Sequence, residues 1–287
     1  TLSRLLHSED ARQTLDLTLR LTQRSVSSEF KGTTLGRLWS FINPLATIAI
    51  FALIFGVVFR GGVEPGRNSG INSFALWIGI GVLSWTFFSS GIMSSMNALV
   101  NNSGLLTKVY FPRQVLIYSA VLSLSVDFAF ELLVLVIIAM MMGGPGVLLM
   151  IPALLVVTLL AGMFAVGLGL ILSIATVYFR DLGHLWQIFN QMWMYASGVV
   201  FPLTMVNKVQ NELFDKGWQI NGGPIPLTMI LRLNPAETYL EAFRSCLYDF
   251  ALPSLPVFLA CLGWAVVMLS LGLVFFRRHS ASIVEEL

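Results

Sequence analysis

Long apolar stretches separated by shorter polar segments run through most of the chain. A bilayer core about 30 Å thick requires roughly 20 consecutive apolar residues in a helix. Six stretches reach or approach that length: Phe41–Phe59, Phe74–Met96, Val115–Met142, Val147–Tyr178, Leu185–Leu203 and Ser254–Phe276. Only the third contains ionisable residues, Asp127 and Glu131. The pattern predicts an all-α polytopic membrane protein with six transmembrane helices.

Positive charge is distributed unevenly between the segments that connect these stretches. The leading segment, alternate connections and the tail hold 11 Lys and Arg residues, whereas the other connections hold 6. Because the richer side of a membrane protein is cytoplasmic as a rule, we expect both termini in the cytoplasm. The chain then divides into a cytoplasmic or interfacial N-terminal segment with a gate (1–40), a transmembrane domain (41–276) and a cytoplasmic tail (277–287).

Composition supports this division. The chain is 56% hydrophobic and 11% charged, whereas soluble domains are about 25% charged. A water-soluble fold could not bury so much apolar surface, so the predicted class is an integral membrane protein.

Two segments outside the apolar stretches predict local structure. Leu15, Leu17, Leu19 and Leu21 alternate with polar residues, which taken literally indicates a strand. An interfacial helix is the better interpretation, because a lone strand beside a membrane leaves its edge unpaired. The outer segment 204–252 is predicted to form short re-entrant helices before the last span, since Asn234-Pro235-Ala236-Glu237 has the composition of a helix start.

Sequence motifs of energy-converting or hydrolytic enzymes are missing. The phosphate-binding pattern Gly-x4-Gly-Lys-Ser/Thr does not occur, and His7, His184 and His279 are far apart in the sequence. The chain is therefore predicted to be no enzyme, to hold no metal and to carry no cofactor of its own. Any uphill transport must draw its energy from another protein or from an ion gradient.

Asp127 and Glu131 lie four residues apart, on one face of the third predicted span. An acid inside a membrane is by default a functional hypothesis, here a proton or cation relay. The alternative is a protonated or hydrogen-bonded pair that fixes helix packing. A misplaced span boundary, which would leave one acid near the interface, is the third interpretation.

Aromatic residues gather near the ends of the predicted spans. The simpler interpretation is interfacial anchoring and core packing. The alternative is a sugar path, because sugar rings stack on aromatic rings and the fifth span adds the amides Gln187 and Asn190. The candidates for such a path are Trp39, Phe55, Phe59, Trp186, Phe189 and Trp193.

In the fourth span, small residues recur at every fourth position and predict close helix packing: Ala161, Ala165, Gly169 and Ser173.

Three landmarks together resemble a known family. The block Phe30–Pro44 has a basic/Gly, Leu-Gly, Leu-Trp and Asn-Pro order, Arg180-Asp181-Leu182 forms a later turn, and a helix starts at Asn234-Pro235 and ends near Arg244. Their order resembles the membrane subunit of O-antigen-type polysaccharide ABC exporters. The sequence of Phe30–Arg60 is most similar to that of exporters of cell-wall galactan from actinobacteria. Teichoic-acid exporters are close relatives.

The resemblance implies a multi-pass protein of the bacterial plasma membrane that exports a polysaccharide carried on polyprenyl diphosphate. It implies a homodimer, two separate ATPase subunits that bind ATP and Mg²⁺, contact with membrane lipids, and no nucleic acid. It places the cytoplasmic gate and diphosphate contact at Lys31, Gly32 and Arg37. It places the ATPase contacts at Lys108, Tyr110, Arg113, Arg180 and Asp181, and the re-entrant helices at Asn234, Pro235 and Arg244. Two rival functions stay open, an ABC permease for small lipophilic drugs and an ion-coupled carrier that uses Asp127 and Glu131.

Overall fold

The computed structural model describes residues 2–29, 35–54, 63–106, 111–220 and 223–279. Almost all of the regular structure in these ranges is helical. The helices are α1 (Leu2–Glu29), η1 (Gly36–Leu38), α2 (Trp39–Phe51), α3 (Phe74–Asn101), α4 (Ser103–Leu106), α5 (Gln114–Gly143), η3 (Pro145–Met150), α6 (Ile151–Tyr178), α7 (Leu182–Tyr195), α8 (Leu203–Asp215), α9 (Leu227–Arg232), α10 (Pro235–Leu247) and α11 (Leu255–His279). A short antiparallel pair joins β1 (Gln219–Ile220) to β2 (Gly223–Pro224).

Four helical segments of the described chain are long and apolar enough to cross a membrane: α3, α5, η3 with α6, and α11. Helix α2 and its continuation to Ile54 form a shorter apolar helix. Helix α7 has 14 residues and ends at Tyr195, so the helix stops before the predicted end of the fifth span at Leu203. The backbone turns there, with Gly198 at a φ of +62° and Pro202 preceding α8. The number of six spans stays a prediction.

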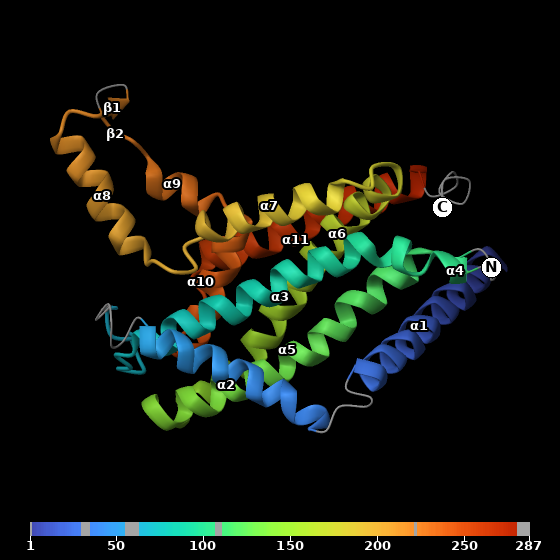
Figure 1. Cartoon of the computed structure of the whole chain (residues 1–287), viewed down its shortest axis with the longest axis horizontal. Coiled ribbons are helices and arrows are strands. Elements are labelled where there is room, and N and C mark those ends of the chain that lie inside the picture. Colours follow the sequence, from blue (N-terminus) through green and yellow to red (C-terminus); the bar gives the residue numbers. More distant parts are fainter. Residues whose placement is uncertain (1, 30–34, 55–62, 107–110, 221–222, 280–287) are drawn as a thin grey trace.

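The helices run alternately between two ends of the molecule (Figure 1). Helix α4, the α6–α7 turn and the end of α11 lie at one end, which we call the α4 end, and α1 begins there too (Figure 1). The loop before α3 and helices α8 to α10 lie toward the other end, which we call the α10 end. An even number of passes requires this arrangement, but the structure contains no membrane that would assign either end to the cytoplasm.

The segment Leu2–Glu29 forms one helix, α1. This agrees with the helix inferred from its place beside a membrane and not with the strand that its alternating leucines indicate. Leu15, Leu17 and Leu19 are exposed, whereas Thr18 and Thr22 are buried on the helix that packs along α5. The Thr18 and Thr22 hydroxyls donate to the carbonyls of Thr14 and Thr18, each four residues back. The contact side of α1 is therefore formed by small hydroxyl residues.

The predicted small-residue face of α6 is a packing surface. A Cβ at Gly169 would overlap the side chain of Ser95 on α3, and one at Gly91 would lie 3.1 Å from the Ala165 Cβ. A second close crossing was not expected from the sequence: a Cβ at Gly272 of α11 would overlap the backbone of Gly167. Helix α6 therefore packs closely against α3 and α11, and the three form the centre of the bundle.

Helix α10 is the buried member of the outer segment. The Asn234 side chain accepts a hydrogen bond from the Ala236 N–H, so the predicted helix start is confirmed. The apolar residues of α10, such as Leu240 and Phe243, are buried, and so is the opposite face, with Glu237 2% and Arg244 7% exposed. The Tyr239 hydroxyl donates to the Cys261 carbonyl of α11 at 2.9 Å, which fixes α10 against the bundle. Helix α8, by contrast, has no buried residue.

Candidate functional site

Two of the loops expected to contact an ATPase lie side by side at the α4 end. A cavity of about 290 Å³ there is lined by Asn97 of α3, Ser103 of α4, Thr176 of α6 and Arg180 of the α6–α7 turn. Arg180 is the residue of the predicted ATPase contacts that lines it. Arg180 and Asp181 are exposed, and Arg113 is half-buried. Lys108 and Tyr110 lie outside the described residues. The structure thus brings Arg180 together with α4 on one surface, available to a partner.

The predicted gate is described only at its edge. Lys31 and Gly32 lie outside the described residues, and of Arg37 only the backbone, in η1, is described. Trp39 begins α2 with an exposed side chain. The diphosphate contact therefore stays a prediction, as does the path assigned to Phe55 and Phe59, which also lie outside the described residues.

Helix α7 carries a run of aromatic rings. The ring centroids of Trp186 and Phe189 are 5.2 Å apart, and those of Phe189 and Trp193 are 5.6 Å apart. The Trp193 ring continues into the core, 5.8 Å from Trp85 and 5.4 Å from Phe88 of α3. Trp193 is therefore engaged in packing between α7 and α3.

The other face of α7 is open. Phe189 is 50% exposed, whereas Trp186 is 9% exposed. The Asn190 amide, expected beside a sugar path, donates to the Ser89 hydroxyl of α3 at 2.7 Å. The exposed apolar face of α7 consists of Leu185, Ile188, Phe189, Met192 and Tyr195. Of the three aromatic candidates on α7, Phe189 offers the most open ring.

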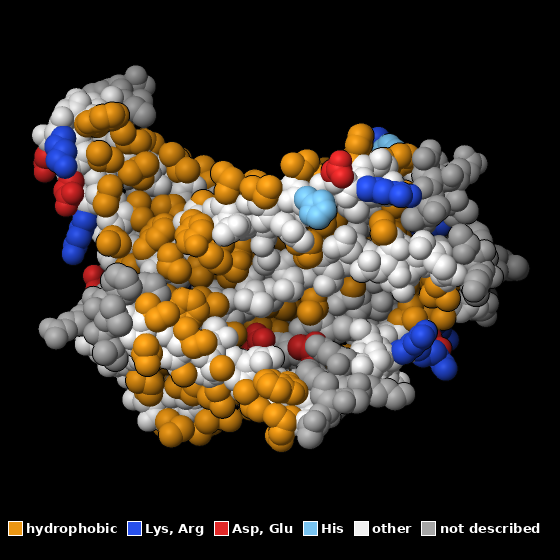
Figure 2. Space-filling model, viewed as in Figure 1, with side chains coloured by type: hydrophobic (Ala, Val, Ile, Leu, Met, Phe, Trp, Pro, Cys, Tyr) orange, Lys and Arg blue, Asp and Glu red, His pale blue; other side chains and the backbone are white. Residues whose placement is uncertain are grey.

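Both α2 and α7 pack against α3, which lies between them in the view of Figure 1. In the same view, hydrophobic side chains cover much of the molecular face, while Lys and Arg side chains lie toward its two ends (Figure 2). This distribution matches a protein whose middle is surrounded by lipid or by other apolar surfaces.

Beyond Tyr195 the chain is held by α10 through a set of contacts that we call the latch. It consists of hydrogen bonds from Asn234 and Arg244 and the packed side chain of Glu237, all on α10, against residues 196–199. The Asn234 amide donates to the Ala196 carbonyl and the Ser197 hydroxyl, each at 2.9 Å. Its oxygen accepts from the Trp193 indole N–H at 2.8 Å. One amide therefore caps α10 and holds the end of α7.

Arg244 forms the second half of the latch. Its two terminal nitrogens donate to the carbonyls of Gly198 and Val199 at 3.0 and 2.8 Å, and its guanidinium lies 3.5 Å from the centre of the Trp77 ring. Burial lowers the pKa of Arg244 to about 10, which leaves it charged at neutral pH. The charge is thus stabilised by carbonyl dipoles and by the indole face.

Glu237 lies on the same face of α10, seven residues before Arg244, and its carboxyl is packed against Gly198. Burial raises the pKa of Glu237 to about 8, an effect opposed by the charge of Arg244. Sequence reasoning named Asn234 and Arg244 but missed Trp77 and Gly198. In the sequence, the seven-residue spacing of the acidic Glu237 and the basic Arg244 was the available signal that this face of α10 also packs against protein.

The two acids of α5 lie near the middle of that 30-residue helix, so a misplaced span boundary is disfavoured. Both are half-buried. Asp127 lines a cavity formed with α1 and α3, and Glu131 does not line it. Whether the pair acts as a relay or fixes packing stays open.

In the described part of the chain, no group of three or more His, Cys, Asp or Glu residues could hold a metal ion.

Comparison with known proteins adds to this geometry. The model of the family described as ABC-2 type transporter matches residues 16–213. The O-antigen export system permease protein RfbA of Myxococcus xanthus is 26% identical over 273 residues, which cover 94% of this chain and 95% of that protein. An O-antigen export system permease protein RfbA of Klebsiella pneumoniae is 24% identical over 191 residues, which cover 67% of this chain and 71% of that protein.

Proposed function

Because this chain belongs to the ABC-2 type transporter family, we propose that it is the membrane subunit of an ATP-driven exporter of a lipid-linked polysaccharide. It is an integral protein of the bacterial inner membrane. The observation that carries the proposal is the match to an O-antigen export permease along 94% of the chain. In this proposal the cargo is a glycan on polyprenyl diphosphate, and it moves from the cytoplasm to the outside.

The α4 end is where the proposal places the motor. Two separate ATPase subunits bind ATP and Mg²⁺ and dock on the surface that contains α4 and Arg180. The support is that two segments distant in the sequence share one cavity there, with Arg180 and Asp181 exposed beside it. A partner that grips both segments at once can move α3 and α6 together.

The passage is proposed to form between two copies of the chain. Apolar faces of α2 and α7 are exposed in the single subunit, including Leu45 and Ile50 of α2 and Ile188 and Met192 of α7. A second copy would cover part of this surface, and Phe189 would offer a ring for stacking with sugars. Lys31 and Arg37 would attract the diphosphate, since each basic residue near a membrane surface contributes about 1 kcal/mol toward anionic groups.

Within this class, we propose that the glycan is a cell-wall galactan or an O-antigen-like polymer. The support is the likeness of Phe30–Arg60 to galactan exporters, together with the names of the two relatives.

The decisive experiment reconstitutes the chain in liposomes with and without the proposed ATPase subunit. Export of a lipid-linked glycan should require both proteins and ATP, and an ATPase whose phosphate-binding lysine is replaced should support none. Uphill movement of cargo by the chain alone, or movement that follows an ion gradient, would overturn the proposal in favour of an ion-coupled carrier. Export of small lipophilic compounds and of no glycan would instead favour a drug permease.

A further inference from the structure

A polar cavity lies between α1 and the bundle and opens to the surface beside the exposed residues Arg24, Ser25 and Ser28 of α1. It has a volume of about 570 Å³ and is bordered by α1, the α3–α4 segment and α5. Nine of the fifteen residues that line it are polar. A neighbouring cavity of about 510 Å³ beside α5, α6 and α11 is lined mainly by leucine, valine and other apolar residues. Polar walls are therefore a property of this cavity and not of every gap in the bundle.

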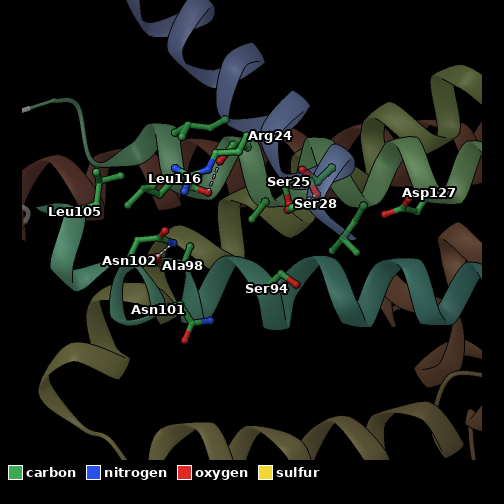
Figure 3. A pocket seen from close by; sticks show the side chains of 15 residues that line it. Arg24, Ser25, Ser28, Ser94, Ala98, Asn101, Asn102, Leu105, Leu116 and Asp127 are labelled. Atoms are coloured by element: carbon green, nitrogen blue, oxygen red, sulfur yellow. Dashed lines mark hydrogen bonds between the residues drawn. The ribbon is translucent and has the colours of Figure 1, made fainter. Parts of the chain in front are cut away.

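The polar groups are arranged by charge along the cavity (Figure 3). Arg24 of α1 lies over Leu116, on the side where Asn102 faces the cavity. The Asp127 carboxylate lies at the other end, turned toward the space between α3 and α5 (Figure 3). Leu116 and Asp127 are eleven residues apart on α5, which corresponds to about 16 Å along a helix. The cavity is thus long, with a basic side chain at one end and an acidic side chain at the other.

Hydroxyl and amide groups line the space between the two charges. Ser94 of α3 and Ser123 of α5 both line it. Ser123 is 7% exposed, and no described residue forms a hydrogen bond with its hydroxyl. Asn102 uses its amide in one hydrogen bond, to the Ala98 carbonyl at 2.8 Å, which leaves its oxygen available. A buried polar group such as the Ser123 hydroxyl is stable only if water or a ligand satisfies it, whereas Ser94 and Asn102 are half-buried.

One class of ligand can interact with all of the polar groups that line this cavity. Resting on the proposed function, we propose that the cavity binds a glycosyl phosphate, the part of the cargo where the first sugar joins the diphosphate. The Arg24 guanidinium pairs with a phosphate oxygen. The sugar hydroxyls donate to the Asp127 carboxylate and exchange hydrogen bonds with Ser94, Ser123 and Asn102. An anion alone would need only the Arg24 end, and a lipid tail would fit the apolar cavity better.

The site has a consequence for the motor. The same α3–α4 segment lines both this cavity and the smaller one that contains Arg180. A bound head group therefore contacts the element that the proposed ATPase would contact from the other side. Binding of cargo and docking of the motor are coupled through α4.

The test uses the complex of this chain with the proposed ATPase in nanodiscs, with Ala120→Cys as a reporter, because Ala120 lines the cavity but has no polar group that would bind the ligand. The native Cys246 and Cys261 are buried, so a water-soluble methanethiosulfonate reagent should modify the new thiol selectively. Galactose 1-phosphate or glucose 1-phosphate should slow this modification about tenfold at about ten times its Kd. Arg24→Gln and Asp127→Asn should each remove the protection. Ser27→Cys, which is exposed on α1 and does not line the cavity, should react at the same rate with and without the sugar phosphate.

The outcomes separate this inference from the proposed function. Equal protection by inorganic phosphate would show an anion site only and would overturn the inference. No protection by either sugar phosphate would also overturn it, and if the same complexes still export a lipid-linked glycan, the proposed function stands. Complexes that export no glycan would count against the proposed function instead.

Discussion

Arg244 is the residue whose environment is most fully specified. Its charge is buried, and its two terminal nitrogens reach two successive carbonyls while its plane covers the Trp77 ring. Lysine carries the same charge but has no planar fork to reach both carbonyls and stack on an indole at once. The guanidinium shape, rather than the charge alone, is what the latch requires.

We therefore expect Arg244→Lys to destabilise the protein by about 3 kcal/mol, the range of one to two hydrogen bonds to a charged group. Thermal unfolding of the detergent-solubilised chain, followed by intrinsic fluorescence, measures the effect. Arg232→Lys is the matched control, because Arg232 is exposed on the same outer segment, and it should change stability little. Equal melting temperatures for the two variants would contradict the role of the latch.

For single residues, sequence reasoning predicted the role correctly where the hydrogen-bond partner is close along the chain. The Asn234 cap was predictable because its acceptor role involves the N–H two residues later. The partners of Arg244 lie about 45 and 167 positions away along the chain, at Gly198, Val199 and Trp77. No local pattern encodes such pairs, so the burial of α10 on both faces could not be predicted from its own sequence.

The two faces of helix α7 have different surroundings. One face carries Trp193, which contacts α3 and the latch, and the other presents Phe189. Periodicity predicted both residues as equivalent candidates for a sugar path. The structure distinguishes them because α3 and Asn234 occupy the surroundings of one ring and leave half of the other exposed.

This difference predicts opposite results for two alanine variants. Trp193→Ala should lower stability by about 3–5 kcal/mol, the usual cost of removing a large packed aromatic. Phe189→Ala should change stability by less than about 1 kcal/mol but slow export about two- to tenfold, as expected for the loss of one stacking contact. Unfolding curves and glycan export in cells measure the two effects. Unchanged export with Phe189→Ala would remove this ring from the proposed path.

The ends of elements were harder to predict than their existence. Apolar length predicted a fifth helix to Leu203, yet α7 ends at Tyr195. Gly198 adopts a left-handed backbone, and the latch satisfies the carbonyls of Ala196 and Gly198, which follow the end of the helix. Uniform hydrophobicity conceals such a break, because the residues after it are as apolar as those before it.

For the molecule as a whole, the alternation of helices between two ends gathers distant loops onto one surface. The α4 end contains the segments 101–106 and 178–184 and the end of α11. Hydropathy and charge counting predicted that these segments share a side. They could not predict that α4 and Arg180 line one cavity, nor which glycan the protein carries.

Arg180→Glu should weaken the binding of the ATPase, because a reversed charge in a contact costs about 2 kcal/mol or more, close to thirtyfold in affinity. Co-purification and titration of the ATPase against the chain in nanodiscs measure the change. Lys216→Glu makes the same reversal at the opposite end of the molecule and should leave ATPase binding unaltered. If both variants bind the ATPase as the unmodified chain does, the motor docks elsewhere.

The crossing of α6 and α11 at Gly167 and Gly272 limits which parts of this protein can move. With backbone against backbone and no side chain between them, the two helices cannot slide or rotate past each other without a collision. They must be displaced together, as one rigid body. In the proposed exporter, widening of the passage then falls to α2 and α7, which pack on the surface of α3 and keep one side exposed.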